Sequence, residues 1–156
     1  MNEPTKQFIV EQTRHMADSL MKLAGRKMDP EWPEMNPEEL ARKVYEADFA
    51  LISHDNAEPY PFLNYGNATA QLLWEMSWDT LQHTQSRYTA EPTRLADRER
   101  VLQQVKEQGF VDDYEGVRIS MTRKRFRIGP ATIWNLSDQE NQYIGQAAMF
   151  KNWKFI

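Results

Sequence analysis

Cysteine is absent from the 156 residues of this chain. The absence excludes disulfides, thiolate nucleophiles and metal centres built on sulfur ligands. Long apolar runs are missing as well, because no stretch approaches the roughly 18 to 20 residues that span a bilayer. The N-terminal residues MNEPTKQ lack the basic and hydrophobic segments of a secretion signal. We therefore expect a cytoplasmic protein of one domain that is not inserted in a membrane.

Histidine is scarce, and the usual catalytic motifs are missing. The histidines are His15, His54 and His83, and a lone histidine is more often a hydrogen-bonded residue than a haem or metal ligand. Paired carboxylates such as Glu38-Glu39 and Asp112-Asp113 fall at helix starts or in loops, where charge is normally solvated. The sequence shows no nucleophilic triad and no glycine loop that could cradle phosphate. We expect no enzymatic activity.

Acidic residues outnumber basic ones, and the net charge of -4 argues against a general nucleic-acid binder. The basic residues nevertheless gather in one segment. They are Arg118, Arg123, Lys124, Arg125 and Arg127. Because Phe126 is the only aromatic residue among them, we interpret the segment as a solvated strand face and hairpin tip. A patch for an acidic partner or for nucleic acid is the alternative.

The chain divides into a helical extension over residues 1–47 and a mixed segment over 48–156. The extension contains a predicted helix over 5–24 with one apolar stripe. The stripe consists of Ile9, Met16, Leu20 and Leu23. A second helix is predicted from Asn36-Pro37, because asparagine caps helices and proline suits the first turn. These two helices must pack on the rest of the chain or on another copy of it.

Residues 48–156 show strand and helix patterns in alternation. We expect strands at 49–53, 60–64, 131–136 and 143–150, a hairpin over 117–128, and helices over 68–75, 78–83 and 93–108. Strands that follow one another in sequence usually lie side by side. The order therefore favours an α+β fold, with one antiparallel sheet and helices on one of its faces.

Several motifs in this segment occur together and in the same order in a known family. They are NYGNATAQLLWEMSWDTL (64–81), SRYTAEP (86–92), R-x-x-V-L (98–102), GVRISMTRKRFRI (116–128), IWNLSDQ (133–139) and IGQAAMFKNW (144–153). On these motifs, residues 49–153 resemble the MEKHLA domain, a module related to PAS domains. The resemblance implies a PAS-like five-stranded antiparallel sheet and a role in sensing, dimerisation or partner binding, with no established ligand. The hairpin turn departs from the family pattern, since it reads Thr122-Arg123-Lys124-Arg125 where a glycine is expected, and a longer or bulged turn would account for this.

In PAS folds the hollow between sheet and helices either holds a small molecule or is filled by side chains. The candidate ligand-binding residues are the apolar Trp74, Met76, Trp78, Trp134 and Met149 and the polar Tyr65, Asn135 and Gln146. The alternative is that they form plain core, since indoles bury large areas. Blue-light sensors of the PAS type carry Asn-Cys-Arg before the long helix, whereas this chain has Gln85-Ser86-Arg87 and can form no cysteinyl adduct with flavin. The sequence leaves the identity of any cofactor unknown.

The helix over residues 5–24 is the predicted homodimer element, because its apolar stripe must be covered by a second copy or by the sheet of its own chain. We expect a PAS-like sensory or regulatory module that binds a small molecule in its core cavity. It would signal through dimer or partner contacts. The alternative function is a protein–protein interaction or dimerisation module with a filled core and no ligand.

Overall fold

A computed structural model describes residues 2–91 and 95–156 of the chain. The helices are α1 (Glu3–Ala24), α2 (Pro37–Tyr45), α3 (Ala68–Trp74), α4 (Trp78–Gln82), the 3₁₀ helix η1 (Ser86–Thr89) and α5 (Leu95–Gln108). The strands are β1 (Ala50–His54), β2 (Leu63–Gly66), β3 (Phe110–Ile119), β4 (Arg125–Ser137), β5 (Tyr143–Phe150) and β6 (Trp153–Phe155). The helices predicted from the sequence are all present, although residues 93 and 94 of the predicted 93–108 helix lie outside the described residues.

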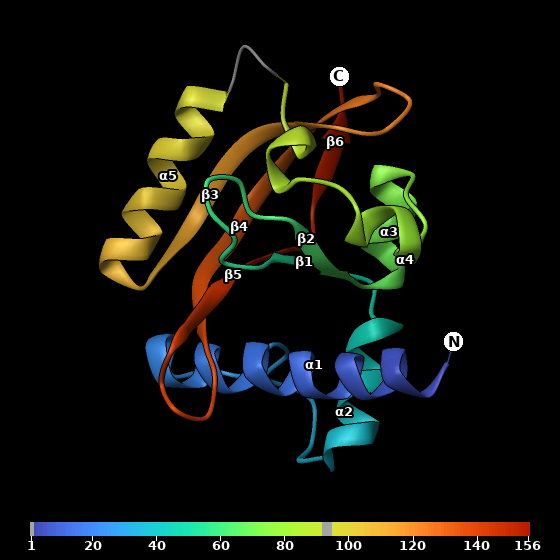
Figure 1. Ribbon diagram of the computed structural model, residues 1–156, viewed down its shortest axis with the longest axis vertical. Coiled ribbons are helices and arrows are strands. Elements are labelled where there is room, and N and C mark those ends of the chain that lie inside the picture. The colour runs from blue at the N-terminus through green and yellow to red at the C-terminus, as the bar shows by residue number, and fades with distance from the viewer. Residues whose placement is uncertain (1, 92–94) are drawn as a thin grey trace.

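The strands form one antiparallel sheet in the order β2-β1-β5-β4-β3, and the short β6 pairs with β4 beside this path. Helices α3 and α5 lie over one face, which we call the inner face, and α1 runs along the opposite, outer face (Figure 1). The predicted α+β class and the PAS-like five-stranded sheet are confirmed. The sequence did not predict β6.

The two longest strands differ from the predicted boundaries. β4 runs through Gly129-Pro130 as one strand, whereas the sequence indicated two strands separated at this point. Gly129 has a φ angle of 138°, which residues with a side chain rarely adopt, and the register with β3 shifts opposite it. The interruption is therefore a bulge within a single strand. β3 begins at Phe110, directly after the glycine that ends α5, and is longer than predicted.

The side chain of Arg118 lies on the inner face, because the residue pairs with the buried Phe126 across the β3–β4 hairpin. It is 8% exposed. The prediction that Arg118 belongs to a solvated strand face is wrong, since α5 and η1 cover this part of β3. In the hairpin turn, Arg123 adopts a φ angle of 70° and so occupies the left-handed position for which a glycine was expected.

Helix α1 packs on the outer face of its own sheet. Its buried side chains include Ile9, Met16 and Leu20, and the indole nitrogen of Trp134 on β4 donates to the Met16 carbonyl at 3.1 Å. The apolar stripe is thus covered within the chain, and self-association through α1 stays a prediction. Among the described residues, neither α1 nor any other helix is long and apolar enough to cross a membrane.

Asn67 joins the helical extension to the sheet and to α3. Its side chain is fully buried. Its Oδ1 accepts from the backbone N–H groups of Leu51 at 3.1 Å and Ala70 at 3.0 Å. Its Nδ2 donates to the carbonyls of Val44 at 3.1 Å and Phe49 at 2.8 Å. One side chain therefore fixes the end of α2, the start of β1 and the first turn of α3.

Candidate ligand-binding site

A cavity of about 50 Å³ lies between the inner face of the sheet and the helices that cover it. The polar residues in its wall are Ser53, His54, Ser86, Thr89, Arg98, Arg118 and Gln146. The apolar residues are Ile52, Leu63, Trp74, Leu102, Ile128, Ile133, Ala147, Ala148 and Phe150. The wall thus combines a hydrophobic base with a cluster of buried polar groups, which is the general composition of small-molecule sites.

His54 ends β1 with its ring buried at the cavity. Its Nδ1 lies 2.7 Å from the Asp55 carbonyl oxygen, and because a carbonyl only accepts, Nδ1 carries the proton. Its Nε2 is buried without a partner among the described residues, as is Nε1 of Trp74. Burial lowers the pKa of His54, and the positive charge of Arg98 acts in the same direction. Together they outweigh the Asp55 carbonyl and the nearby Gln146 side chain, which raise the pKa. The neutral ring therefore offers an unused acceptor, and the indole an unused donor.

Two arginines contribute charge to the same wall. Arg98 reaches it from α5 and donates to the Ser86 hydroxyl on η1 and to Glu99. Arg118 reaches it from β3 and donates to the Val117 carbonyl at 3.0 Å. Both side chains are at least nine-tenths buried. Arginine is almost never buried to this degree without a counter-charge, so the pair is an unusual feature of the fold.

Gln146 and Asn135 anchor the C-terminal half of α5 to the sheet. Gln146 Nε2 donates to the Leu102 carbonyl at 2.9 Å and to Asn135 Oδ1 at 3.1 Å. Asn135 Nδ2 in turn donates to the carbonyls of Val105 at 3.0 Å and Lys106 at 3.2 Å. Lys106 is among the last four residues of α5, whose carbonyls lack partners inside the helix, and Asn135 supplies one. The Val105 carbonyl also accepts from the Gly109 backbone N–H. The two side chains thus hold α5 over the cavity.

The eight residues predicted to bind a ligand fall on both sides of the sheet. Trp74 and Gln146 line the cavity, Asn135 supports it from the same face, and Met76 packs in the inner hydrophobic cluster. The others belong to the outer cluster, against α1. They are Tyr65, Trp78, Trp134 and Met149. A ligand-binding role for any of these residues stays a prediction.

The separation of Trp74 from Trp78 has a local cause. Trp74 is the last residue of α3, and Glu75 ends that helix with a φ angle of 59°. Ser77 then caps α4 by accepting from the Thr80 backbone N–H at 3.1 Å. The two indoles consequently do not share a helix face. Trp78 turns toward the outer cluster, with its ring centroid 5.7 Å from that of Tyr65.

Of the polar residues in the cavity wall, only Gln146 was predicted to bind a ligand. The others, namely Ser53, His54, Ser86, Thr89, Arg98 and Arg118, were not. A signal for Arg98 was present, because residues 95, 98, 102 and 105 share one helical face and three of them are apolar. An arginine within such a stripe indicates a buried charge. Arg118 gave no such signal, since its neighbours fit a strand with one solvated face.

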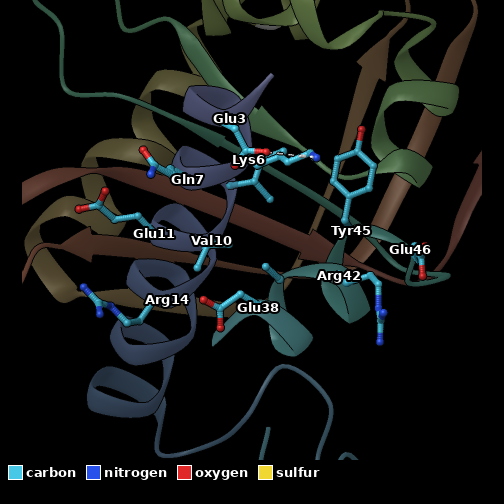
Figure 2. A pocket seen from close by; sticks show the side chains of 12 residues that line it. Glu3, Lys6, Gln7, Val10, Glu11, Arg14, Glu38, Arg42, Tyr45 and Glu46 are labelled. Atoms are coloured by element: carbon cyan, nitrogen blue, oxygen red, sulfur yellow. Dashed lines mark ion pairs between the residues drawn. The ribbon is translucent and has the colours of Figure 1, made fainter. Parts of the chain in front are cut away.

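A second and larger hollow separates α1 from α2 on the outer side of the molecule. This groove has a volume of about 760 Å³. Its apolar residues are Ile9, Val10, Ala41 and Tyr45, and its polar ones are Glu3, Lys6, Gln7, Glu11, Arg14, Glu38, Arg42 and Glu46. Figure 2 shows the side chains of α1 along one side of the groove and those of α2 along the other. An apolar floor with a charged rim suits a protein contact.

The sheet, its helical cover and the cavity between them define a PAS-like fold. A family model of the MEKHLA domain matches residues 10–155. The chain therefore belongs to the MEKHLA domain family, as the sequence motifs predicted. The match begins inside α1 and so extends beyond the segment 49–153 that carried the resemblance.

Solved structures share this fold at low sequence identity. The PAS domain of a protein from Colwellia psychrerythraea matches with a TM-score of 0.60 and 11% identity, over 76% of this chain and 95% of that one. An RNA-binding light-oxygen-voltage receptor matches with a TM-score of 0.60 and 13% identity, over 76% of this chain and 35% of the receptor. A light-oxygen-voltage domain studied with a flavin analogue matches with a TM-score of 0.51 and 12% identity, over 76% of this chain and 84% of that one. No curated protein matches the chain.

Flavin does not fit the cavity. The volume of the cavity, about 50 Å³, is far below the roughly 300–1,000 Å³ of sites that enclose drug-sized ligands. The buried guanidinium groups of Arg98 and Arg118 take up part of the space between α5 and the sheet. The chain, moreover, has no cysteine that could form an adduct with flavin. A ligand of this cavity must be much smaller than a flavin.

Proposed function

We propose that this chain is a PAS-like sensory module in which a small molecule in the cavity alters the contacts of α1 and α2 with a second copy or another protein. The observation that carries the proposal is the pair of unpartnered groups in the cavity wall, His54 Nε2 and Trp74 Nε1. A buried polar atom without a partner costs free energy, and a ligand that bonds to it recovers that cost. The proposal includes no catalytic step.

A hydrogen bond connects β1, which lines the cavity, to α1 on the outer face. It supports the proposal that a ligand in the cavity affects the contacts of α1. Ser53 precedes His54 on β1, and its hydroxyl accepts from Gln12 Nε2 of α1 at 3.1 Å. The same hydroxyl donates to Asn64 Oδ1 of β2 at 2.7 Å. Gln12 is buried, so this contact is shielded from water. A ligand that displaces β1 would therefore displace α1 as well.

A second candidate function is an interaction module with a filled core. The observation in its favour is the size of the two hollows, since the groove between α1 and α2 is about 760 Å³ and the cavity only about 50 Å³. In this case the groove would receive a partner, and the cavity would be an ordinary packing defect. Both candidates use the surface of α1 and α2, and they differ in whether the cavity is occupied.

Native mass spectrometry of freshly purified protein separates the two candidates. For the sensory module we expect a mass above that of the bare chain, and this excess should disappear when the protein is unfolded. The variant Ala148→Leu should lose the excess mass because it fills the cavity, at a cost of about 1–3 kcal/mol in stability. Ala96→Leu, on the exposed side of α5, is the matched control and should retain it.

A bare chain that gains no thermal stability from any compound in a panel of small metabolites would contradict the sensory function. If the same protein forms a dimer or a defined complex, the chain functions as an interaction module with a filled core. The thermal measurement is needed beside the mass spectrum, because a weakly bound ligand can be lost during purification.

A further inference from the structure

We infer that the cavity binds a short-chain carboxylate, such as formate or acetate, between the guanidinium groups of Arg98 and Arg118. The inference rests on the proposed function and adds the chemical class of the ligand. It follows from the charge, the size and the donor groups of the cavity wall.

The two arginines bring more positive charge to the cavity than the surrounding residues balance. Arg98 is 5% exposed and Arg118 8%. Arg98 contacts the carboxylate of Glu99 at 3.2 Å, but that side chain is 61% exposed. Arg118 donates to uncharged oxygens, at 3.0 Å to the Val117 carbonyl and at 3.4 Å to the Tyr114 hydroxyl. Among the described residues, none of those lining the cavity is acidic.

This charge persists at neutral pH. Burial, and after it the neighbouring Arg118, lowers the pKa of Arg98 to about 10, although Glu99 acts in the opposite direction. At pH 7 the group is still protonated, and the two guanidiniums repel each other. Burying unbalanced charge is costly. An anion between them would replace the repulsion by two attractions.

The size and shape of the cavity select a small planar anion with an apolar end. A volume of about 50 Å³ holds about three to five water-sized groups, which suits formate or acetate. Guanidinium groups bind carboxylates through parallel N–H···O bonds. The Ser86 hydroxyl accepts from Arg98 and keeps its own proton to donate, and the Trp74 indole N–H is a second free donor. The carboxylate pairs with these donors and leaves the acceptor His54 Nε2 unused. Ile52 and Phe150 provide an apolar surface for a methyl group.

The same two arginines separate the cavity from a hollow at the protein surface. This hollow has a volume of about 240 Å³ and lies between α5 and β3, with Asp97, Tyr114 and Arg127 also in its wall. Because Arg98 and Arg118 line both spaces, rotation of their side chains would connect them. Positive charge at such an entrance attracts anions. The ligand would then enter past the groups that bind it.

Thermal unfolding and isothermal titration with acetate test the inference on the full chain. Acetamide serves as the neutral isostere and nitrate as the planar inorganic anion. Ionic strength is held constant with sodium chloride, because salt screens exposed charges. We expect acetate to raise the Tm and to shift the Trp74 indole N–H signal in a ¹H–¹⁵N spectrum, assigned by its loss in Trp74→Phe. Acetamide should do neither.

Arginine variants show whether the predicted groups hold the ligand. We expect Arg98→Gln and Arg118→Gln each to weaken acetate binding on the order of 10–100-fold, because each removes a charged hydrogen bond. Arg123→Gln, in the exposed turn between β3 and β4 and outside both hollows, should bind acetate as the parent does. Should an arginine variant fail to fold, Ser86→Ala tests the same site, with a loss of about tenfold.

The outcomes distinguish this inference from the proposed function. Equal responses to acetamide and acetate, or unchanged acetate affinity in the folded variants, would overturn the carboxylate assignment. Tighter binding of nitrate than of acetate would overturn it in favour of an inorganic oxyanion. A retained compound that is not an anion would contradict only the assignment of a carboxylate ligand and would leave the proposed sensory function intact. If no anion binds, the purified protein carries no compound and no metabolite of the panel raises the Tm, the inference and the sensory function both fail.

Discussion

The carboxylate of Glu75, at the end of α3, accepts a hydrogen bond from the Ser120 hydroxyl, with 2.8 Å between Oε2 and Oγ. The same oxygen accepts from the hydroxyl of Thr122, and Oε1 lies 3.1 Å from Nζ of Lys124. All three partners belong to the turn between β3 and β4. One side chain thus joins the helix over the inner face to the tip of the longest hairpin.

Glu75→Gln should weaken the fold in a pH-dependent way. The hydroxyls of Thr122 and Ser120 and the ammonium of Lys124 lower the pKa of Glu75 from 4.5 to about 2. A carboxyl whose pKa is lower in the folded state stabilises the fold above its unfolded pKa, and this contribution is lost as pH falls toward 2. We expect the parent to have a higher urea midpoint than Glu75→Gln at pH 7, and the difference to shrink between pH 4.5 and 2.

The control for this measurement is Glu11→Gln, which removes a carboxylate on the exposed side of α1. Its urea midpoint should follow that of the parent across the whole pH range. A constant difference between parent and Glu75→Gln from pH 7 to pH 2 would show that packing rather than charge holds the hairpin turn.

Asn67→Ala should destabilise the protein by about 2–4 kcal/mol, because it removes a helix cap and leaves buried backbone groups unpaired. The affected groups are the N–H of Leu51 and the carbonyls of Val44 and Phe49. Asn2→Ala is the matched control, since Asn2 caps α1 in the same way but at an exposed end. It should cost only about 0.5–1 kcal/mol. Chemical unfolding gives both values, and equal losses would contradict the joining role of Asn67.

Much of the fold could be predicted from the sequence because the signals are local. Asn36, Asn67 and Ser77 each cap a helix, as their spacing indicated. Strand limits were less accurate where backbone geometry decides them. The predicted strand at 60–64 lies at Leu63–Gly66, after the proline-rich turn. At Gly129 a positive φ angle keeps one strand continuous where the sequence indicated a break.

The candidate site was harder to predict because it depends on which side of the sheet each residue faces. Trp74 and Trp78 are four residues apart, and the left-handed Glu75 between them sends their rings to opposite layers. Arg118 alternates with apolar residues as a solvated residue would, yet α5 covers it. Such coverage comes from the packing of distant segments, which a local pattern does not contain.

Arg118→Met should leave the ligand-free protein as stable as the parent or stabilise it by about 1–2 kcal/mol, because it removes an unbalanced buried charge. The variant should also raise the pKa of Arg98, which Arg118 lowers at present. Arg26→Met is the comparison, since Arg26 is 38% exposed and pairs with Asp112 at 2.5 Å. Loss of that partly exposed pair should cost at most about 1 kcal/mol.

Urea unfolding in buffer free of carboxylates measures the free energy of unfolding of both arginine variants. If Arg118→Met loses more than about 2 kcal/mol, the hydrogen bonds of Arg118 to Val117 and Tyr114 stabilise the hairpin more than the buried charge destabilises it. The charge argument for an anion in the cavity would then be weakened, and the affinity of the glutamine variants for acetate would decide the matter.

Val10→Glu tests the proposed contact surface on α1. Val10 lies in the groove between α1 and α2, and it is partly exposed. A carboxylate at this position would be desolvated by a partner in the groove, so we expect native mass spectrometry to show a shift from dimer to monomer. The Tm of the monomer should change little, because the side chain still reaches water.

Lys22→Glu, near the other end of the same helix and outside the groove, should leave the dimer intact. A parent protein that is monomeric at all concentrations, or a Val10→Glu variant that dimerises as the parent does, would show that this groove is not the self-association surface.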